Sequence, residues 1–290
     1  MAITYDAVKT VSAELYDRSL RRIPADALAA LRAAQAAETN AVGRQTLVAM
    51  VDSAEQAERT HHFVCSDAGV PTYFVRIGTR LTLDGDIRQA ISDGFDELVQ
   101  RIQPPLLMHV TNPLTNERGY KGKDVPIISF DLIGDADYVE MICSPKALGS
   151  GRWAALKIFS FPSVETIEEY ILEVVLEAGS QPCPPVVIGV GIGGSFDHAA
   201  AMATAAMLRP VGAHHPEPQL ANMEERLLAA VNSTGFGPMG TGGDTTAMAV
   251  NVEYSAGHGF TPVAVCFNCW INRRTRARIY DNGRVERFDA

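Results

Sequence analysis

The five cysteines are the residues whose chemistry is most readily read from this sequence. Two of them form a CxxC pair, and another is followed directly by two prolines. Proline after a ligating cysteine recurs in iron–sulfur sequences, and it keeps the next residues extended rather than helical. Such thiols can pack, bind a metal or react, and the five positions are Cys65, Cys143, Cys183, Cys266 and Cys269.

Three interpretations of these thiols stay open on their spacing alone. A free cysteine most often packs as a small apolar side chain. A zinc site normally needs two close pairs or a pair beside histidines, and this chain has the single close pair Cys266 and Cys269. Three separated cysteines on loops instead suit a [4Fe-4S] cluster with one iron that lacks a protein ligand. That iron can bind a substrate as a Lewis acid.

The segment Gly189–Gly194 satisfies the pattern GxGxxG between a predicted strand, Val186–Val190, and a predicted helix, Phe196–Leu208. In a dinucleotide-binding unit an acidic residue ends a second strand about 20 positions further on. Here that region is the proline-containing stretch Arg209–Glu217, so the pattern alone does not establish NAD or FAD binding. It does predict a backbone that a ligand can approach closely, beside helix N–H groups that suit an anion.

The composition excludes several classes of protein. Of the 290 residues, 47% are hydrophobic and 20% are charged, which is ordinary globular usage. The formal net charge is −9, and no run of Lys or Arg offsets it, which argues against nucleic-acid binding. No apolar run approaches the ~18–20 residues that span a bilayer, and the N-terminus lacks the pattern of an export signal. We therefore expect a cytoplasmic protein with reduced thiols and no membrane segment.

The elements that must position these residues fall into three stretches. Residues 1–60 have apolar spacings of three and four, which predict two or three amphipathic helices. Residues 61–160 contain short β-rich runs broken by Pro, Asn and Gly, and a polar helix is expected from Ser163 to about Ala178. Further strands are predicted near 246–254 and 261–267, and an exposed loop at Pro210–Pro218.

Five segments carry the most distinctive residue patterns: Cys65-Ser-Asp-Ala-Gly69, Ser144-Pro-Lys-Ala-Leu-Gly-Ser150, Cys183-Pro-Pro with Gly189-Val-Gly-Ile-Gly-Gly194, Gly237-Pro-Met-Gly-Thr-Gly-Gly243, and Cys269-Trp-Ile-Asn-Arg-Arg274. In this order they resemble the class I fumarate hydratases. The chain looks like the α part of the two-subunit fumarase and L(+)-tartrate dehydratase type, and the resemblance covers nearly its whole length.

The resemblance implies a fold, a cofactor and a reaction. The fold would be α+β, like the class I fumarase α domain, with a helical layer over 1–60 packed on mixed β-sheets within one domain, 1–290. Cys65, Cys183 and Cys269 would hold a [4Fe-4S] cluster, and the other two cysteines would pack. The reaction would be the reversible hydration or dehydration of a small dicarboxylate of the fumarate/malate or tartrate type. A separate β subunit would complete the enzyme in an α2β2 assembly.

Residues in the matching motifs take their expected roles from the same resemblance. Asp67, His258 and Lys146 are the candidates for proton transfer and for polar contacts at the reacting centre. Six further residues are candidates for holding the substrate carboxylates, through charge or through backbone N–H groups. They are Arg118, Gly149, Gly242, Gly243, Thr245 and Arg273.

Several substrate-contacting segments depart from the family pattern. Ser66 and Ala68 stand where the family has Gln and Thr, the stretch Asn116–Pro126 is longer, and the triple-glycine turn has become Ala147-Leu148-Gly149. Lost hydrogen-bond partners change which substrate a pocket accepts, so the dicarboxylate is not fixed by the sequence. Two alternative functions stay open: a non-catalytic iron–sulfur protein with a structural or redox-sensing role, and a nucleotide-dependent oxidoreductase.

Overall fold

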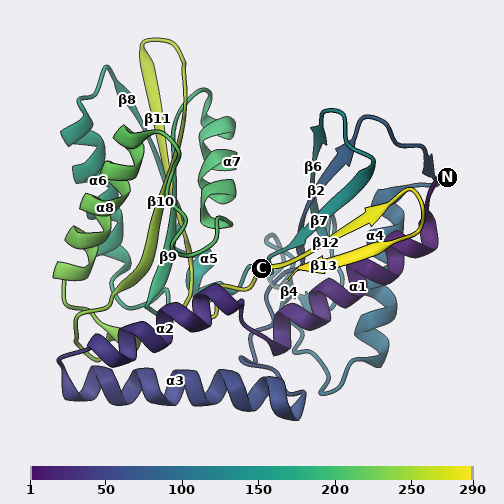
Figure 1. Cartoon of the computed structure of the whole chain (residues 1–290), viewed down its shortest axis with the longest axis horizontal. Helices are drawn as coiled ribbons and strands as arrows, with labels where there is room; N and C mark the ends of the chain where they lie inside the picture. The colour runs from purple at the N-terminus through teal and green to yellow at the C-terminus, as the bar shows by residue number, and fades with distance from the viewer. Residues whose placement is uncertain (1, 289–290) are drawn as a thin grey trace. The chain divides into compact units, whose positions relative to one another are not determined.

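The structure, a computed structural model, describes residues 2–288 and has an α+β fold with mixed β-sheets (Figure 1). The α+β class predicted from the sequence is confirmed. The chain divides into two compact units, and each combines segments from distant parts of the sequence. Among the described residues, the first unit comprises 2–24, 53–147 and 273–288, and the second comprises 25–52 and 148–272. A single domain over 1–290 stays a prediction.

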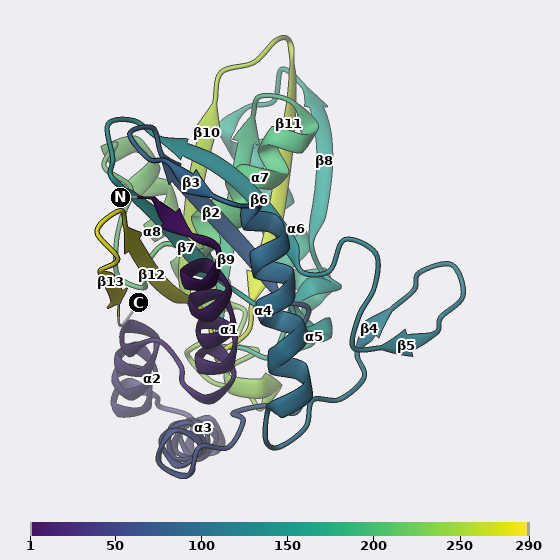
Figure 2. The same cartoon turned by 90° about the vertical axis from the view of Figure 1, so that its right-hand side faces the viewer.

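The first unit is built on a five-stranded sheet in the order β13-β12-β7-β2-β6. Strands β2 and β6 are parallel, and the other neighbours are antiparallel. Helices α1 and α4 lie side by side over this sheet (Figure 2), and the rings of Tyr16 and Phe95 meet edge to face between them, with centroids 5.4 Å apart. The bounds are α1 (Tyr5–Arg21), α4 (Ile87–Arg101), β2 (Thr72–Gly78), β6 (Ile127–Ile133), β7 (Tyr138–Cys143), β12 (Thr275–Tyr280) and β13 (Val285–Phe288).

Two small sheets complete this unit. Strands β1 (Ile3–Thr4) and β3 (Leu83–Asp84) pair in parallel, and β4 (Val110–Thr111) pairs with β5 (Arg118–Gly119) as an antiparallel hairpin. The β4–β5 hairpin extends away from the five-stranded sheet (Figure 2).

The second unit is built on a four-stranded sheet in the order β10-β9-β11-β8. Helices α6 and α8 cover one face and α7 covers the other (Figure 1), and the apolar residues of α6, α8 and the strands form one core. The bounds are α2 (Ala25–Ala37), α5 (Leu148–Gly151), α6 (Val164–Ala178), α7 (Phe196–Met207), α8 (Pro218–Ser233), β8 (Ala155–Ser160), β9 (Val186–Gly193), β10 (Ala247–Ser255), β11 (Phe260–Asn268) and the 3-10 turn η1 (Pro238–Gly240). Helix α3 (Ala41–Thr60) contributes residues to both units.

The glycines of the GxGxxG pattern have a packing role in the second unit. A Cβ on Gly189 would lie 2.1 Å from the carbonyl oxygen of Ala203, and one on Gly191 would lie 2.1 Å from that of Ala199. Both carbonyls belong to α7, which packs directly on β9. The absence of side chains at Gly189 and Gly191 therefore lets α7 approach β9 closely. Close packing alone thus explains these two glycines, without a bound nucleotide.

Most predicted elements are confirmed. Residues 5–60 form helices α1, α2 and α3, and Ser163 caps α6 by accepting the backbone N–H of Thr166 at 3.2 Å. The strand, Gly-rich turn and helix around Gly189–Gly194 are present, and 210–217 is a loop. Helices α4 and α8 and strands β12 and β13 were not predicted from the sequence. Within residues 2–288, no helix is long and apolar enough to cross a membrane.

Candidate functional site

The turns that carry Cys183 and Cys269 are joined in the second unit. Cys183 precedes β9 and Cys269 follows β11, and these strands are antiparallel neighbours, so both turns lie at one end of the sheet. The backbone N–H of Trp270 donates to the carbonyl oxygen of Cys183 at 3.1 Å. Cys183 itself has a left-handed backbone, with φ of 60°, and both thiols are half-buried. The structure therefore brings together two of the three cysteines expected to bind the cluster.

Two further segments meet the Cys183 turn. A Cβ on Gly149, in α5, would lie 3.3 Å from the carbonyl oxygen of Gln181 and 3.6 Å from Cys183 Sγ, so this glycine packs directly beside the Cys183 turn. The backbone N–H of Met239 donates to the carbonyl oxygen of Pro184 at 2.8 Å, which holds the Gly-Pro-Met-Gly turn against the same segment. The predicted site residue Gly149 is thus placed beside a predicted ligand.

Cys143 and Cys266 pack against neighbouring side chains and do not lie in exposed turns. Cys143 ends β7 and is fully buried, and this burial raises the pKa of its thiol. Cys266 lies within β11, packs against α7, and has its Sγ 3.8 Å from Met207 Sδ. The packing role predicted for both residues is confirmed. Within the CxxC pair, Cys269 is the member that leaves the strand for the turn.

The Gly-rich turn Gly242–Thr245 already meets an anion that belongs to the chain. Glu38 is fully buried, and both its carboxylate oxygens accept the backbone N–H of Asp244 at 2.9 Å. A Cβ on Gly243 would lie 2.8 Å from this carboxylate, so only glycine fits there. The backbone N–H and hydroxyl of Thr39 donate to the Asp244 carboxylate, which lowers the pKa of that group. Gly242, Gly243 and Thr245 are half-buried along this turn.

In the first unit, the turn Cys65–Gly69 gathers three predicted site residues. The Asp67 carboxylate accepts the N–H of Gly69 at 3.1 Å, which closes the turn locally. Arg273 Nη1 donates to the carbonyl oxygen of Asp67 at 2.7 Å, and Lys146 forms a two-way backbone bridge with Val70. Asp67, Lys146 and Arg273, which lie far apart in sequence, therefore meet at the turn that begins at Cys65.

Arg273 is a buried cation with open donors. Arg273 is 4% exposed. The Ser144 hydroxyl donates to the backbone carbonyl oxygen of Arg273 at 2.8 Å and so holds the Arg273 backbone in place. Its Nε and Nη2 have no hydrogen-bond partner among residues 2–288. Buried donors are almost always paired, and a guanidinium fork suits a carboxylate, so these two donors favour an anionic ligand.

His109 also contacts the Cys65–Gly69 turn, and it was not predicted from the sequence. Its Nε2 lies 2.8 Å from the carbonyl oxygen of Gly69. No motif contains His109, and the only signal for it in the sequence is its place just before the segment that departs from the family pattern.

Arg118 and His258 are not gathered with the cysteine-bearing turns of their own units. Arg118 is exposed on the β4–β5 hairpin. His258 is exposed in the loop before β11, with its ring stacked on Phe260, whereas Cys269 follows the other end of that strand. Nine strand residues separate the two ends, which corresponds to roughly 25–30 Å.

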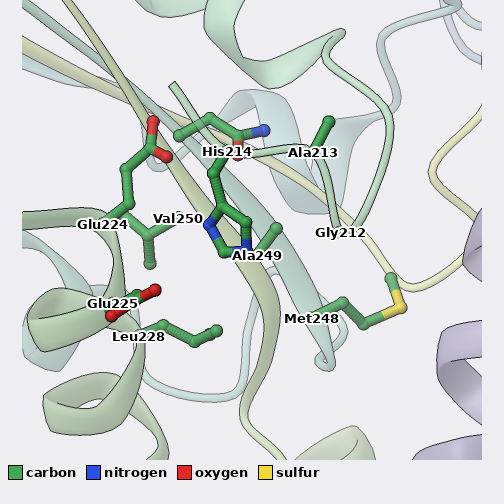
Figure 3. A pocket seen from close by; sticks show the side chains of 10 residues that line it. Gly212, Ala213, His214, Glu224, Glu225, Leu228, Met248, Ala249 and Val250 are labelled. Atoms are coloured by element: carbon green, nitrogen blue, oxygen red, sulfur yellow. The ribbon is translucent and has the colours of Figure 1, made fainter. Parts of the chain in front are cut away.

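A small cavity in the second unit lies between the 212–214 loop, α8 and β10 (Figure 3). Its volume is about 60 Å³, room for about two waters. The carboxylate of Glu224, at the cavity wall, accepts hydrogen bonds from Arg209 and from the backbone N–H groups of His215 and Val252. The cavity is too small for a dicarboxylate, and the residues described at its wall include none of the predicted site residues.

Among the described residues, no three Cys, His, Asp or Glu side chains form a ready-made metal site. Each unit by itself contributes only part of the predicted ligand set, since Cys65 belongs to the first unit and Cys183 and Cys269 belong to the second.

Comparison with known proteins defines the class of this chain as a hydro-lyase. Residues 9–278 match the family model described as Fumarate hydratase (Fumerase), and the chain belongs to this family.

The alignments with relatives span most of this chain and most of each relative. A protein of Methanocaldococcus jannaschii called "Putative L(+)-tartrate dehydratase subunit alpha" is 35% identical over 280 residues, which are 94% of this chain and 97% of the relative. The "L(+)-tartrate dehydratase subunit alpha" of Escherichia coli strain UTI89 is 30% identical over 264 residues, 89% of this chain and 86% of the relative. The "L(+)-tartrate dehydratase subunit alpha" of Escherichia coli strain K12 is 31% identical over 258 residues, which are 87% of this chain and 84% of the relative.

Proposed function

We propose that this chain is the cluster-carrying α subunit of a [4Fe-4S]-dependent hydro-lyase that acts on a small dicarboxylate of the tartrate or fumarate/malate type. The observation that carries the proposal is the hydrogen bond from the Trp270 N–H to the Cys183 carbonyl oxygen, because it joins the turns of two predicted thiolate ligands. The names of the relatives, tartrate dehydratase α subunits, support the substrate class.

The chemistry of the donor set fits an iron–sulfur cluster. Cys183 and Cys269 are half-buried in turns, in contrast to the fully buried Cys143, and Gly149 packs directly beside the Cys183 turn. Cys65, at the start of the turn that contains Asp67, is the third proposed ligand. When bound, the cluster would supply a Lewis-acidic iron that makes the substrate hydroxyl a better leaving group.

The chain's own residues would bind and orient the acid. The open Nε and Nη2 donors of Arg273 would hold one carboxylate of the substrate, and Arg118 would approach a carboxylate from the hairpin. Lys146, bridged to Val70, would add a positive charge to the same segment. Asp67 would contact the substrate hydroxyl or move a proton there, and the backbone at Gly149 and at Gly242–Thr245 would line the site.

His258 stays a proposed proton carrier. Within its own unit it is placed at the end of β11 opposite Cys269. Replacement by Gln tests it: loss of kcat with an unchanged cluster supports the role, and unchanged kcat removes it from the site.

A separate β subunit is the proposed partner. The relatives are named as α subunits, which implies a second subunit in those enzymes. The β subunit would supply the rest of the substrate contacts, and activity would require both chains.

The deciding experiment is anaerobic purification of the α chain with its β partner, followed by iron and sulfide analysis and electron paramagnetic resonance. We expect about four irons per α chain. Cys183→Ser, Cys269→Ser and Cys65→Ser should each lose the cluster, whereas the matched control Cys266→Ser, which alters a packed thiol, should keep it. A full cluster in Cys183→Ser contradicts the proposal.

The substrate is tested on the same complex with L(+)-tartrate, malate and fumarate. Turnover of one of them supports the hydro-lyase assignment and identifies the acid. A complex that holds the cluster but converts none of them would instead favour the non-catalytic iron–sulfur alternative.

A further inference from the structure

The carbonyl oxygen of Gly69 accepts two side-chain donors in the first unit. Tyr16 donates its hydroxyl at 2.9 Å, and His109 Nε2 lies at 2.8 Å. Gly69 has φ of 73°, and a Cβ there would lie 2.9 Å from the carbonyl carbon of Lys146, so its backbone has a single closely fitted position. This carbonyl ends the turn that starts at Cys65 and contains Asp67.

The second nitrogen of the His109 ring is also engaged. Nδ1 lies 2.6 Å from the carbonyl oxygen of Leu107. The two ring nitrogens thus meet carbonyl oxygens of two separate backbone segments, at Gly69 and at Leu107. The His109 ring therefore links these two segments.

His109 stands at the base of the hairpin that carries Arg118. It immediately precedes β4, which pairs with β5 through Val110 with Gly119 and Thr111 with Arg118. Leu107 and Met108, just before it, are exposed, whereas Val110 is buried. The hairpin base is thus anchored through Val110 and through the ring of His109.

We propose that His109 is a positioning residue that ties the Arg118 hairpin to the Cys65–Gly69 turn. The tie sets where Asp67 stands relative to Arg118, and with it the fit of the substrate. This inference rests on the proposed function, because it uses Asp67 and Arg118 as substrate contacts. His109 itself acts through the Gly69 carbonyl and is not assigned a contact with the substrate.

Two isosteric variants separate the two hydrogen bonds of His109. The amide nitrogen of Gln reaches the position of Nε2, so His109→Gln keeps the donor to Gly69 and gives up the one to Leu107. The amide nitrogen of Asn reaches the position of Nδ1, so His109→Asn keeps the Leu107 contact and gives up the Gly69 contact. Both variants retain a polar side chain at a half-exposed position, so either one is expected to fold.

The first measurement is steady-state kinetics of the α–β complex with iron content determined in parallel. His109→Asn should raise KM several-fold, up to about tenfold, the scale of one lost hydrogen bond, with full iron content. His109→Gln should restore KM to within about twofold of the parent. The matched control is His62→Asn, because His62 is an exposed histidine near Cys65 whose ring contacts its neighbour Thr60.

The second measurement is hydrogen–deuterium exchange of amides 65–70 in the cluster-free α chain. It does not depend on the activity. His109→Asn should speed this exchange, and His109→Gln should not. Faster exchange with an unchanged KM would reduce His109 to a structural role and overturn the proposal, as would equal exchange in both variants. If the parent complex has no hydro-lyase activity, the proposed function fails, and the exchange comparison still decides whether His109 holds the turn.

Discussion

The backbone N–H of Trp270 lies 3.1 Å from the carbonyl oxygen of Cys183, its hydrogen-bond acceptor. The two residues are far apart in sequence, and the bond forms because β9 and β11 are antiparallel neighbours whose ends meet. The sheet of the second unit therefore brings together the Cys-Pro-Pro and Cys-Trp motifs. A change in either turn should therefore affect the other.

Gly149→Val should lower the iron content of the complex several-fold without unfolding it. A Cβ at Gly149 would lie 3.6 Å from Cys183 Sγ, and the added methyl groups would occupy space beside the thiol. Iron analysis and thermal unfolding of the purified complex measure the two effects. The matched control is Gly151→Val in the same helix, where a Cβ would have no atom within 4 Å among the described residues. Equal iron contents in the two variants would contradict the prediction.

Cys143 should resist thiol reagents in the folded, cluster-free α chain. The thiolate is the reactive form, and burial raises the pKa of Cys143 while also blocking access. We expect its alkylation by iodoacetamide to be more than about tenfold slower than that of Cys183, a half-buried thiol. Mass spectrometry of peptides after timed labelling measures both rates. The difference between the two alkylation rates should vanish in urea. Alkylation of Cys143 as fast as that of Cys183 in the native protein would refute the packing role of Cys143.

Glu38→Ala should destabilise the second unit by about 2–4 kcal/mol. The backbone N–H groups of Asp244 and Asn40 donate to the buried Glu38 carboxylate, and each such hydrogen bond to a charged group contributes roughly 1.5 kcal/mol. Glu38→Gln should cost less, because its amide oxygen still accepts. Urea denaturation gives the free energy of unfolding. Glu169→Ala, on the exposed side of α6, is the control and should change it by less than about 0.5 kcal/mol.

The Asp244 carboxylate should make the stability of the protein depend on acid pH. Hydrogen bonds from Thr39 hold its pKa below the ordinary value of 3.8. A lowered pKa in the folded state stabilises the protein above the unfolded value of about 3.9, and this contribution is lost as pH falls through the folded pKa. Asp244→Asn should therefore flatten the decline in urea midpoint below about pH 4 and lower the midpoint near pH 7. Parallel pH profiles of parent and variant would count against this contribution.

Local signals in the sequence predicted much of the fold. Ser163 is a typical N-cap, and the glycines before Phe196 mark the end of a strand and the start of a helix. Helix α4 also carries such signals, since Asp86 caps it and its buried residues recur at helical spacing from Ile87 to Leu98. It was missed because short β-rich runs on both sides of it dominate that stretch of sequence.

The candidate site was predictable only where a motif carried it. Cys183 and Cys269 stand in distinctive segments, and their turns do meet. His109 and Glu38 carry no motif, because their importance comes from single contacts to backbone groups distant in sequence, Gly69 and Asp244. Such contacts depend on tertiary structure, which periodicity and composition do not encode residue by residue.

Gly191→Ala should destabilise the second unit and so distinguish a packing role for the GxGxxG pattern from nucleotide binding. An added Cβ would lie 2.1 Å from the carbonyl oxygen of Ala199, a backbone atom of α7, so the helix must move away from β9. We expect a loss of about 1–3 kcal/mol in urea denaturation, the usual cost of overpacking a core. The control is Gly151→Ala, where the backbone has no left-handed φ and the Cβ would meet no atom within 4 Å among the described residues. Calorimetric titration of the cluster-free parent with NAD should show no binding, and measurable binding that Gly191→Ala abolishes at unchanged stability would restore the nucleotide alternative.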